Sequence, residues 1–294
     1  MKFPKFSKRS LAYLSLLVTA IIWGVAVAVI KYTLSFIDPL SFLFFRFLLS
    51  SVILLPFFLI LIRRQPIAKK DFLNLFFLGT LATTIVLGFL FIGMQYTTAI
   101  DTSLISVLGP IMIVFGGAYF LKEKVTGREK IGLSIAVLGS LIAIIEPLLK
   151  TNSYPQALFG NSLVFLSYLV WAVYTLFYKK SSPKYHPLIV TFFSFFSGLI
   201  TLTPIFLIHN SSFIIHHSAL PGILYMSIFS SCLAYFTYNL GVSLIEASEA
   251  SVFEYLKPIF TAPLAFFWLK ETITLPFLLG AIIIAIGVAI SEWR

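Results

Sequence analysis

The sequence predicts an all-α integral membrane protein of ten transmembrane helices, arranged as two inverted five-helix repeats. Three observations support this fold class. First, 59% of the 294 residues are hydrophobic and only 11% are charged, whereas about a quarter of the residues in a soluble protein are charged. Second, ten largely apolar runs follow one another along the chain, each long enough to cross a bilayer. Third, the second half of the sequence repeats the first half at a constant offset.

The apolar runs define the expected helices and their order. They lie at roughly 11–30, 40–62, 72–93, 99–121, 130–149, 157–178, 187–208, 219–240, 248–269 and 273–291. The first run follows a basic start, as the hydrophobic region of a signal peptide does. It is too long for such a region, so we expect it to be retained as the first helix. The connecting segments are too short to hold a soluble domain.

Residues of the first half recur 148 positions later without a gap. About 28 of about 130 aligned positions are identical, against about 10 expected by chance for this composition. The matches include Trp23 with Trp171, Pro110 with Pro258, and Leu121-Lys122-Glu123 with Leu269-Lys270-Glu271. We therefore expect repeats at 1–150 and 151–294 within one membrane domain. Because each repeat holds five spans, the two must cross the bilayer in opposite directions, as in many secondary transporters.

Lysine and arginine residues fall mainly in one set of connecting segments. If the N-terminus lies in the cytoplasm, sixteen of them are cytoplasmic, and only Lys31, Lys150 and Lys270 are external. The positive-inside rule then predicts that both termini are cytoplasmic, in a protein of the inner (cytoplasmic) membrane. This topology also explains the net charge of +10, so we expect the lipid bilayer, and not nucleic acid, as the partner of these residues.

The sequence carries no signature of an enzyme or of a metal or cofactor site. Its single cysteine, Cys232, excludes a disulfide framework and a cysteine-based metal cluster. The four histidines lie in or near connecting segments without a nearby acid, and no glycine loop of the ATP-binding type is present. We expect no cofactor, and a gradient as the energy source. The alternatives from other classes are an intramembrane enzyme acting on lipid-linked substrates and a non-transporting receptor or scaffold.

Short motifs occur in a characteristic order along both halves. They are Ile22-Trp23-Gly24, Asp38-Pro39-Leu40, Phe45-Arg46-Phe47, Ala99-Ile100-Asp101-Thr102-Ser103, Gly109-Pro110 and Leu121-Lys122-Glu123, then Lys257-Pro258, Leu269-Lys270-Glu271, Gly280 and Gly287. This ordered set resembles the drug/metabolite transporter superfamily, in particular its ten-helix EamA-type members. The resemblance implies ten helices around a central cavity, alternating access, and in most cases export of amino acids or other small metabolites. Other relatives carry nucleotide sugars, sugar phosphates or cationic drugs.

Glu254 and Lys257 are the leading candidates for a functional site. A charge at the centre of a membrane span costs about 2.5–3.5 kcal/mol on insertion scales, so it indicates function. The two residues are three positions apart, on one helix face, where they can pair. Their counterparts in the first repeat are Ser106 and Gly109, so the charges break the symmetry. We interpret Glu254 as a substrate or proton-coupling residue, with a structural ion pair as the alternative.

Proton coupling would follow from the pairing itself. A carboxylate beside Lys257 is favoured in its charged form. If substrate or a conformational change separates the pair, buried Glu254 should bind a proton more readily.

Arg46, about two turns into its helix, is expected to extend to the lipid headgroups, with substrate or gate contact as the alternative. Asp101, Glu246 and Glu249 lie near helix starts, where acids complement the helix dipole.

Further cavity candidates are aromatic or polar side chains within or next to the spans. They are Trp23, Gln95, Tyr96, Ser106, Trp171, Tyr174, Tyr178, Tyr235, Tyr238, Asn239 and Tyr255, in addition to Glu254 and Lys257. Trp171, Tyr174 and Tyr178 share one helix stripe, which is more often core than binding site. The glycine pairs Gly132/Gly139 and Gly280/Gly287 are seven residues apart, which suits close helix packing in lipid.

The sequence thus predicts a transporter that exports small metabolites, with amino acids as the leading substrate class. A sugar-phosphate or nucleotide-sugar carrier would need several cations in the cavity, and only Arg46 and Lys257 are available. A cationic drug carrier would need an unpaired acid, which Lys257 argues against. We expect a monomer, since ten helices can enclose a cavity without a second copy.

Overall fold

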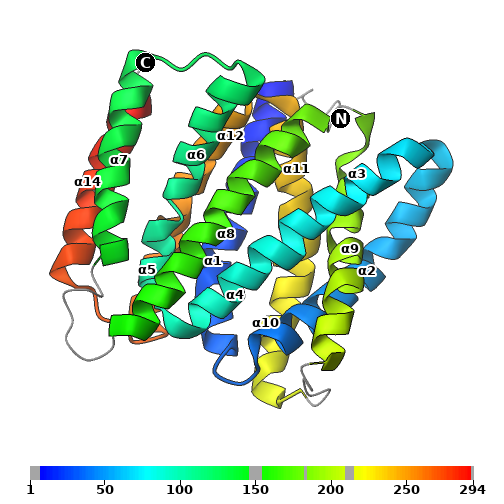
Figure 1. The fold of residues 1–294 in the computed structure, drawn as a ribbon, viewed down its shortest axis with the longest axis horizontal. Coiled ribbons are helices and arrows are strands. Elements are labelled where there is room, and N and C mark those ends of the chain that lie inside the picture. The colour runs from blue at the N-terminus through cyan, green and yellow to red at the C-terminus, as the bar shows by residue number, and fades with distance from the viewer. Residues whose placement is uncertain (1–6, 146–153, 182–183, 209–214, 293–294) are drawn as a thin grey trace, which may run out of the picture.

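The computed structural model describes residues 7–145, 154–181, 184–208 and 215–292, and all regular structure in them is helical (Figure 1). The first half contains α1 (Lys8–Thr33), α2 (Pro39–Arg64), α3 (Lys69–Thr80), η1 (Leu81–Ile85), α4 (Val86–Tyr96), α5 (Ala99–Ile105), α6 (Leu108–Gly116), η2 (Gly117–Leu121) and α7 (Gly127–Ile145). The second contains α8 (Tyr154–Ser181), α9 (Pro187–Ile208), η5 (His217–Ala219), α10 (Leu220–Tyr225), η6 (Met226–Leu233), α11 (Ala234–Leu244), α12 (Ala247–Ser251), η7 (Val252–Leu256), α13 (Lys257–Phe267) and α14 (Leu275–Glu292).

Each predicted apolar run corresponds to one helix or to consecutive helical segments in the described residues, with a turn at residues 106–107 inside the 99–121 run. Seven of these segments are long and apolar enough to cross a membrane, which is consistent with an integral membrane protein; the total of ten spans stays a prediction. Several helices extend about a turn beyond the apolar run, because polar residues of the first and last turns also adopt helical geometry. The end of the 130–149 run, and Lys2, Lys5, Lys150, His209 and Arg294, lie outside the described residues.

The first helix of each half packs against the other half. Helix α1 contacts α11 and α13, and α8 contacts α4 and α6 in the equivalent way. Further cross-repeat pairs include α2 and α3 with α9, and α7 with α14, which forms one side of the bundle in Figure 1. The halves are therefore interlocked rather than laid side by side.

The two halves also run in opposite directions. Near the end of α1, the Lys31 ammonium donates hydrogen bonds to the Met94 and Thr97 carbonyls, at 2.9 and 2.5 Å, where α4 ends. The start of α8 reaches the same place, since a Cβ on Gly160 would lie 2.8 Å from the Gly93 carbonyl oxygen. Helix α1 thus ends where its counterpart α8 begins, as inverted repeats require.

The repeated Leu-Lys-Glu triplets tie each half to the other. The Glu271 carboxylate accepts hydrogen bonds from the Ala99 and Ile100 amides, at 2.8 and 2.9 Å, at the start of α5. The Glu123 carboxylate does the same for the start of α12, at 2.9 and 3.0 Å from the two amides. Each carboxylate satisfies backbone donors that a helix start leaves free and complements the helix dipole. The preceding lysines, Lys122 and Lys270, both adopt left-handed backbone conformations, with φ of 58° and 57°.

Glycines allow α7 and α14 to approach closely, as their seven-residue spacing predicts. A Cβ on Gly139 would lie 2.7 Å from the Gly280 carbonyl oxygen, and one on Gly287 would lie 2.5 Å from the Gly132 carbonyl oxygen. The two contacts are related by the repeat symmetry. Small residues of this kind are the usual means by which helices associate in lipid.

Candidate functional site

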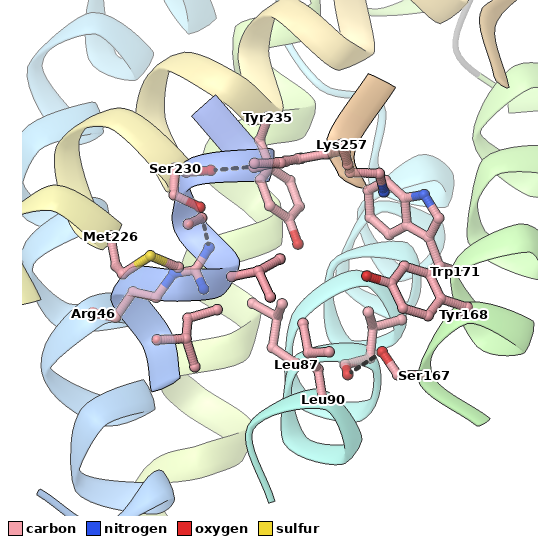
Figure 2. A pocket seen from close by; sticks show the side chains of 15 residues that line it. Arg46, Leu87, Leu90, Ser167, Tyr168, Trp171, Met226, Ser230, Tyr235 and Lys257 are labelled. Atoms are coloured by element: carbon pink, nitrogen blue, oxygen red, sulfur yellow. Dashed lines mark hydrogen bonds between the residues drawn. The ribbon is translucent and has the colours of Figure 1, made fainter. Parts of the chain in front are cut away.

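A cavity lies between the two halves and is lined by both of them (Figure 2). It contains about 540 Å³ of space free of protein atoms, including its open side. Its aliphatic lining residues are Ala26, Val27, Ile30, Val86, Leu87, Leu90 and Met226, and its aromatic lining residues are Trp23, Tyr168, Trp171 and Tyr235. The polar and charged lining residues are Arg46, Ser167, Ser230 and Lys257. This mainly apolar surface with a few polar groups is typical of small-molecule sites.

An ion pair lies at one wall of this cavity. The Lys257 Nζ is 2.7 Å from Glu254 Oε2, and the two side chains are only 5% and 4% exposed. The other carboxylate oxygen of Glu254 accepts hydrogen bonds from the Trp171 indole, at 3.0 Å, and from the Tyr238 hydroxyl, at 3.3 Å. Lys257 borders the cavity, whereas Glu254 lies behind it. Because the carboxylate is held by three donors, its charge is well compensated.

Local helix geometry explains how the pair forms. Pro258 has no amide hydrogen, and its ring clashes with the carbonyl four residues earlier in an α-helix. The preceding residues 252–256 accordingly form a 3₁₀ helix, η7, which contains Glu254. In a 3₁₀ turn, side chains three residues apart lie directly above one another. The interruption of α-helical geometry before Pro258 therefore brings Glu254 and Lys257 together.

Aromatic rings surround the Lys257 ammonium. Its Nζ lies 5.6 Å from the Trp23 ring centre and 5.2 Å from the Tyr168 ring centre. Trp23 and Trp171, which are equivalent in the two repeats, meet edge to face at 5.2 Å between centroids. The Trp23 indole donates to the Ser230 carbonyl at 3.1 Å. Both indole N–H groups are thus satisfied within the protein, as a tryptophan at this depth requires.

Arg46 does not extend to the headgroups, contrary to the sequence-based expectation. It is 1% exposed and borders the cavity from α2. Its Nε donates to the Ser231 hydroxyl at 2.8 Å, and its Nη2 donates to the Ser230 hydroxyl at 3.3 Å. The two serines lie in η6, a wide π-helical segment of the type often found at functional sites. The expectation rested on the short distance of Arg46 from the start of its helix. Whether the side chain is buried depends instead on the direction in which it points.

The structure brings some of the predicted candidates to the cavity and leaves others away from it. Trp23, Trp171, Tyr235 and Lys257 line it, and Glu254 and Tyr238 lie directly behind them. The sequence offered a substrate or gate contact of Arg46 only as the alternative, and it did not indicate Ser167, Met226 or Ser230. Ser106, the counterpart of Glu254, is buried and hydrogen-bonded to Tyr168.

The remaining candidates lie elsewhere. Tyr174, Tyr178 and Asn239 form a fully buried network, in which the two tyrosine hydroxyls donate to the Asn239 side-chain and backbone oxygens at 3.0 and 2.8 Å. Gln95 and Tyr96 are exposed at the end of α4. Tyr255 borders a separate hollow with Glu246 and Glu249. Within the described residues, no three His, Cys, Asp or Glu side chains gather where they could hold a metal.

Comparisons with known proteins agree with this architecture. The model of the EamA-like transporter family matches residues 10–145 and 158–293, two ranges separated by the same 148-residue offset. An "Uncharacterized transporter" from Archaeoglobus fulgidus is 30% identical over 95% of this chain and 97% of its own length. The "Uncharacterized transporter YyaM" from Bacillus subtilis is 26% identical over 94% of this chain and 92% of its own. A solved crystal structure aligns with a TM-score of 0.72 at 15% identity, covering 97% of both chains, and shares the fold.

Proposed function

We propose that this chain, which belongs to the EamA-like transporter family, exports small metabolites across the cytoplasmic membrane by alternating access, with amino acids as the leading substrate class. The observation that carries the proposal is the buried Glu254–Lys257 pair at the wall of a cavity between inverted repeats. Substrate binds in that cavity, and relative movement of the interlocked repeats opens it to one side and then to the other.

Glu254 couples the movement to protons in this proposal. While Lys257, Trp171 and Tyr238 hold its carboxylate, the charged form is stabilised. Substrate or helix movement that withdraws these donors leaves a carboxylate in an apolar environment, where binding a proton removes the cost of the buried charge. Release of the proton on the other side restores the pair.

Counterflow in proteoliposomes tests the substrate class and the role of Glu254 together. Vesicles are preloaded in turn with pooled amino acids, sugar phosphates and organic cations. We expect accumulation with the amino-acid pool and at least tenfold slower counterflow in Glu254→Gln, because the amide cannot hold the charge that pairs with Lys257. The control is Glu246→Gln, the same substitution at the exposed residue that precedes α12.

Three results separate the parts of this proposal. Counterflow that is slower in Glu254→Gln but keeps the wild-type pH dependence would leave a substrate role and exclude coupling. Unchanged counterflow in Glu254→Gln would assign the ion pair to the scaffold. Accumulation with sugar phosphates or cations instead of amino acids would overturn the substrate class.

We propose a monomeric carrier with ten spans and cytoplasmic termini. This inverted topology predicts that two equivalent positions are labelled from opposite sides of the membrane. Lys124 and Thr272 are repeat counterparts, and both are exposed just after the Leu-Lys-Glu triplets. In a Cys232→Ser background, Lys124→Cys should react with a membrane-impermeant thiol reagent from the cytoplasm and Thr272→Cys from outside. Labelling of both from the same side would contradict the inverted arrangement.

A further inference from the structure

Arg46 has donor capacity that the protein does not use. Its Nε and Nη2 donate to Ser231 and Ser230, but Nη1 is buried and has no hydrogen-bond partner among the described residues. Two phenylalanine rings, Phe91 and Phe195, lie 5.6 and 5.9 Å from the guanidinium carbon and contribute no acceptor in the guanidinium plane. A buried donor without a partner is costly and rare in native structures.

The charge of Arg46 is also uncompensated. Of the two cations that line the cavity, Lys257 is neutralised by Glu254 at 2.7 Å. Among the described lining residues none is acidic, and the neighbours of Arg46 are serine hydroxyls and aromatic rings. The cavity therefore carries one net positive charge, located at Arg46. An ionisable group kept in this state within a membrane protein usually marks a substrate or ion pathway.

We propose that Arg46 is the subsite for the carboxylate of the substrate. This inference rests on the proposed carrier function and names the chemical class of its substrate: a small organic monocarboxylate with an apolar body. The carboxylate accepts hydrogen bonds from Nη1 and from the second N–H of Nη2, the fork geometry that suits arginine and carboxylate. The body of the substrate lies against the cavity-lining residues Trp23, Trp171 and Leu87, of which Figure 2 shows Trp171 and Leu87.

The two serines explain why an arginine can serve this purpose. By holding Nε and Nη2, Ser231 and Ser230 fix the guanidinium plane against η6 and leave Nη1 outside these two bonds, while Arg46 itself borders the cavity (Figure 2). An immobilised fork loses less entropy on binding than a free one. Nη1 is shielded from water in this structure, so the carboxylate reaches it as the cavity widens, and the dry environment strengthens the bond.

The charge balance favours a carboxylate over other ligands. A phosphate dianion would need more than the single net charge available, because Lys257 is already paired. An organic cation would meet Arg46 and Lys257 without an acid lining the cavity. A purely structural arginine that joins α2 to η6 through its two serine bonds would leave Nη1 as a buried donor without a partner, which is costly.

Matched acid and amide probes test the subsite without any variant. Wild-type proteoliposomes are preloaded with L-leucine or L-leucinamide, and with L-phenylalanine or L-phenylalaninamide. Binding of the same four probes to purified protein is followed by tryptophan fluorescence, since Trp23 and Trp171 border the cavity. We expect counterflow and binding with the acids, and at least tenfold weaker signals with the amides.

Substitutions then assign the effect to Arg46. Arg46→Gln should lose the preference for acids over amides, and Arg46→Lys, which keeps the charge but not the fork, should retain part of it. Arg63→Gln, at an exposed arginine of the same helix, serves as the control and should behave as wild type. If Arg46→Gln does not fold, the comparison of acid and amide in the wild type still decides the proposal.

The outcomes separate the subsite from the carrier function. Equal counterflow of acids and amides, or an unchanged acid preference in Arg46→Gln, would overturn the carboxylate subsite and keep the carrier. Acid-specific binding that Arg46→Gln abolishes, without counterflow, would uphold the subsite and overturn the carrier. Neither binding nor counterflow of any of the acids would overturn both.

Discussion

Lys257→Met should lower the free energy of unfolding by about 3–5 kcal/mol, the usual cost of removing one partner of a buried ion pair. The substitution leaves Glu254 4% exposed and without its cation. The double variant Glu254→Gln/Lys257→Met removes both charges together. It should recover most of the lost stability, because replacing a whole buried pair by neutral groups is often nearly neutral.

Thermal unfolding of the purified protein in detergent measures this difference. Lys130→Met, at an exposed lysine, is the control and should leave Tm unchanged. Both the single and the double variant should lack transport, because the proposed mechanism needs the charged pair. Destabilisation by the double variant equal to the sum of the Glu254→Gln and Lys257→Met single variants would show that Glu254 and Lys257 are not energetically coupled.

Gly287→Ala should destabilise the protein by about 1–3 kcal/mol, in the range of overpacked sites. The new Cβ would lie 2.5 Å from the Gly132 carbonyl oxygen and 2.6 Å from the Ala136 amide nitrogen. Both are backbone atoms, so α7 and α14 would have to move apart, and loss of their close contact weakens helix association in lipid.

The matched control is Gly88→Ala within α4. A Cβ there would meet nothing within 4 Å, so the substitution should be neutral or stabilise by about 0.4–1 kcal/mol through the unfolded state. The same detergent unfolding assay compares the two variants. A Gly287→Ala protein as stable as Gly88→Ala would mean that the α7–α14 contact is looser than described.

Much of the fold was predictable because it depends on local or repeated sequence features. The apolar runs located the helical segments, and the 148-residue offset indicated two related halves, which the family match at 10–145 and 158–293 supports. The cross-repeat caps were not predictable. Glu123 and Glu271 are far in sequence from the helix starts that they cap, and the triplets alone indicated only that the two positions are equivalent.

The site was predictable to the extent that it is local. The spacing of Glu254 and Lys257 predicted their contact, since residues three apart share a helix face. The position of Arg46 depends on the direction of its side chain and on two serines more than 180 residues away. Tyr174, Tyr178 and Asn239 carry the same polar groups as cavity residues, but tertiary packing places them in a satisfied core network.

Access to Ala26 from both sides of the membrane tests the central claim most directly. Ala26 is small and lines the cavity from α1, and Ala26→Cys is introduced into the Cys232→Ser background. Lys124→Cys and Thr272→Cys report the orientation and sealing of the vesicles. Alternating access predicts that an impermeant thiol reagent labels Ala26→Cys from either side, and that saturating substrate slows the labelling. Labelling from one side only, with both controls reacting normally, would contradict a carrier that exposes this cavity alternately.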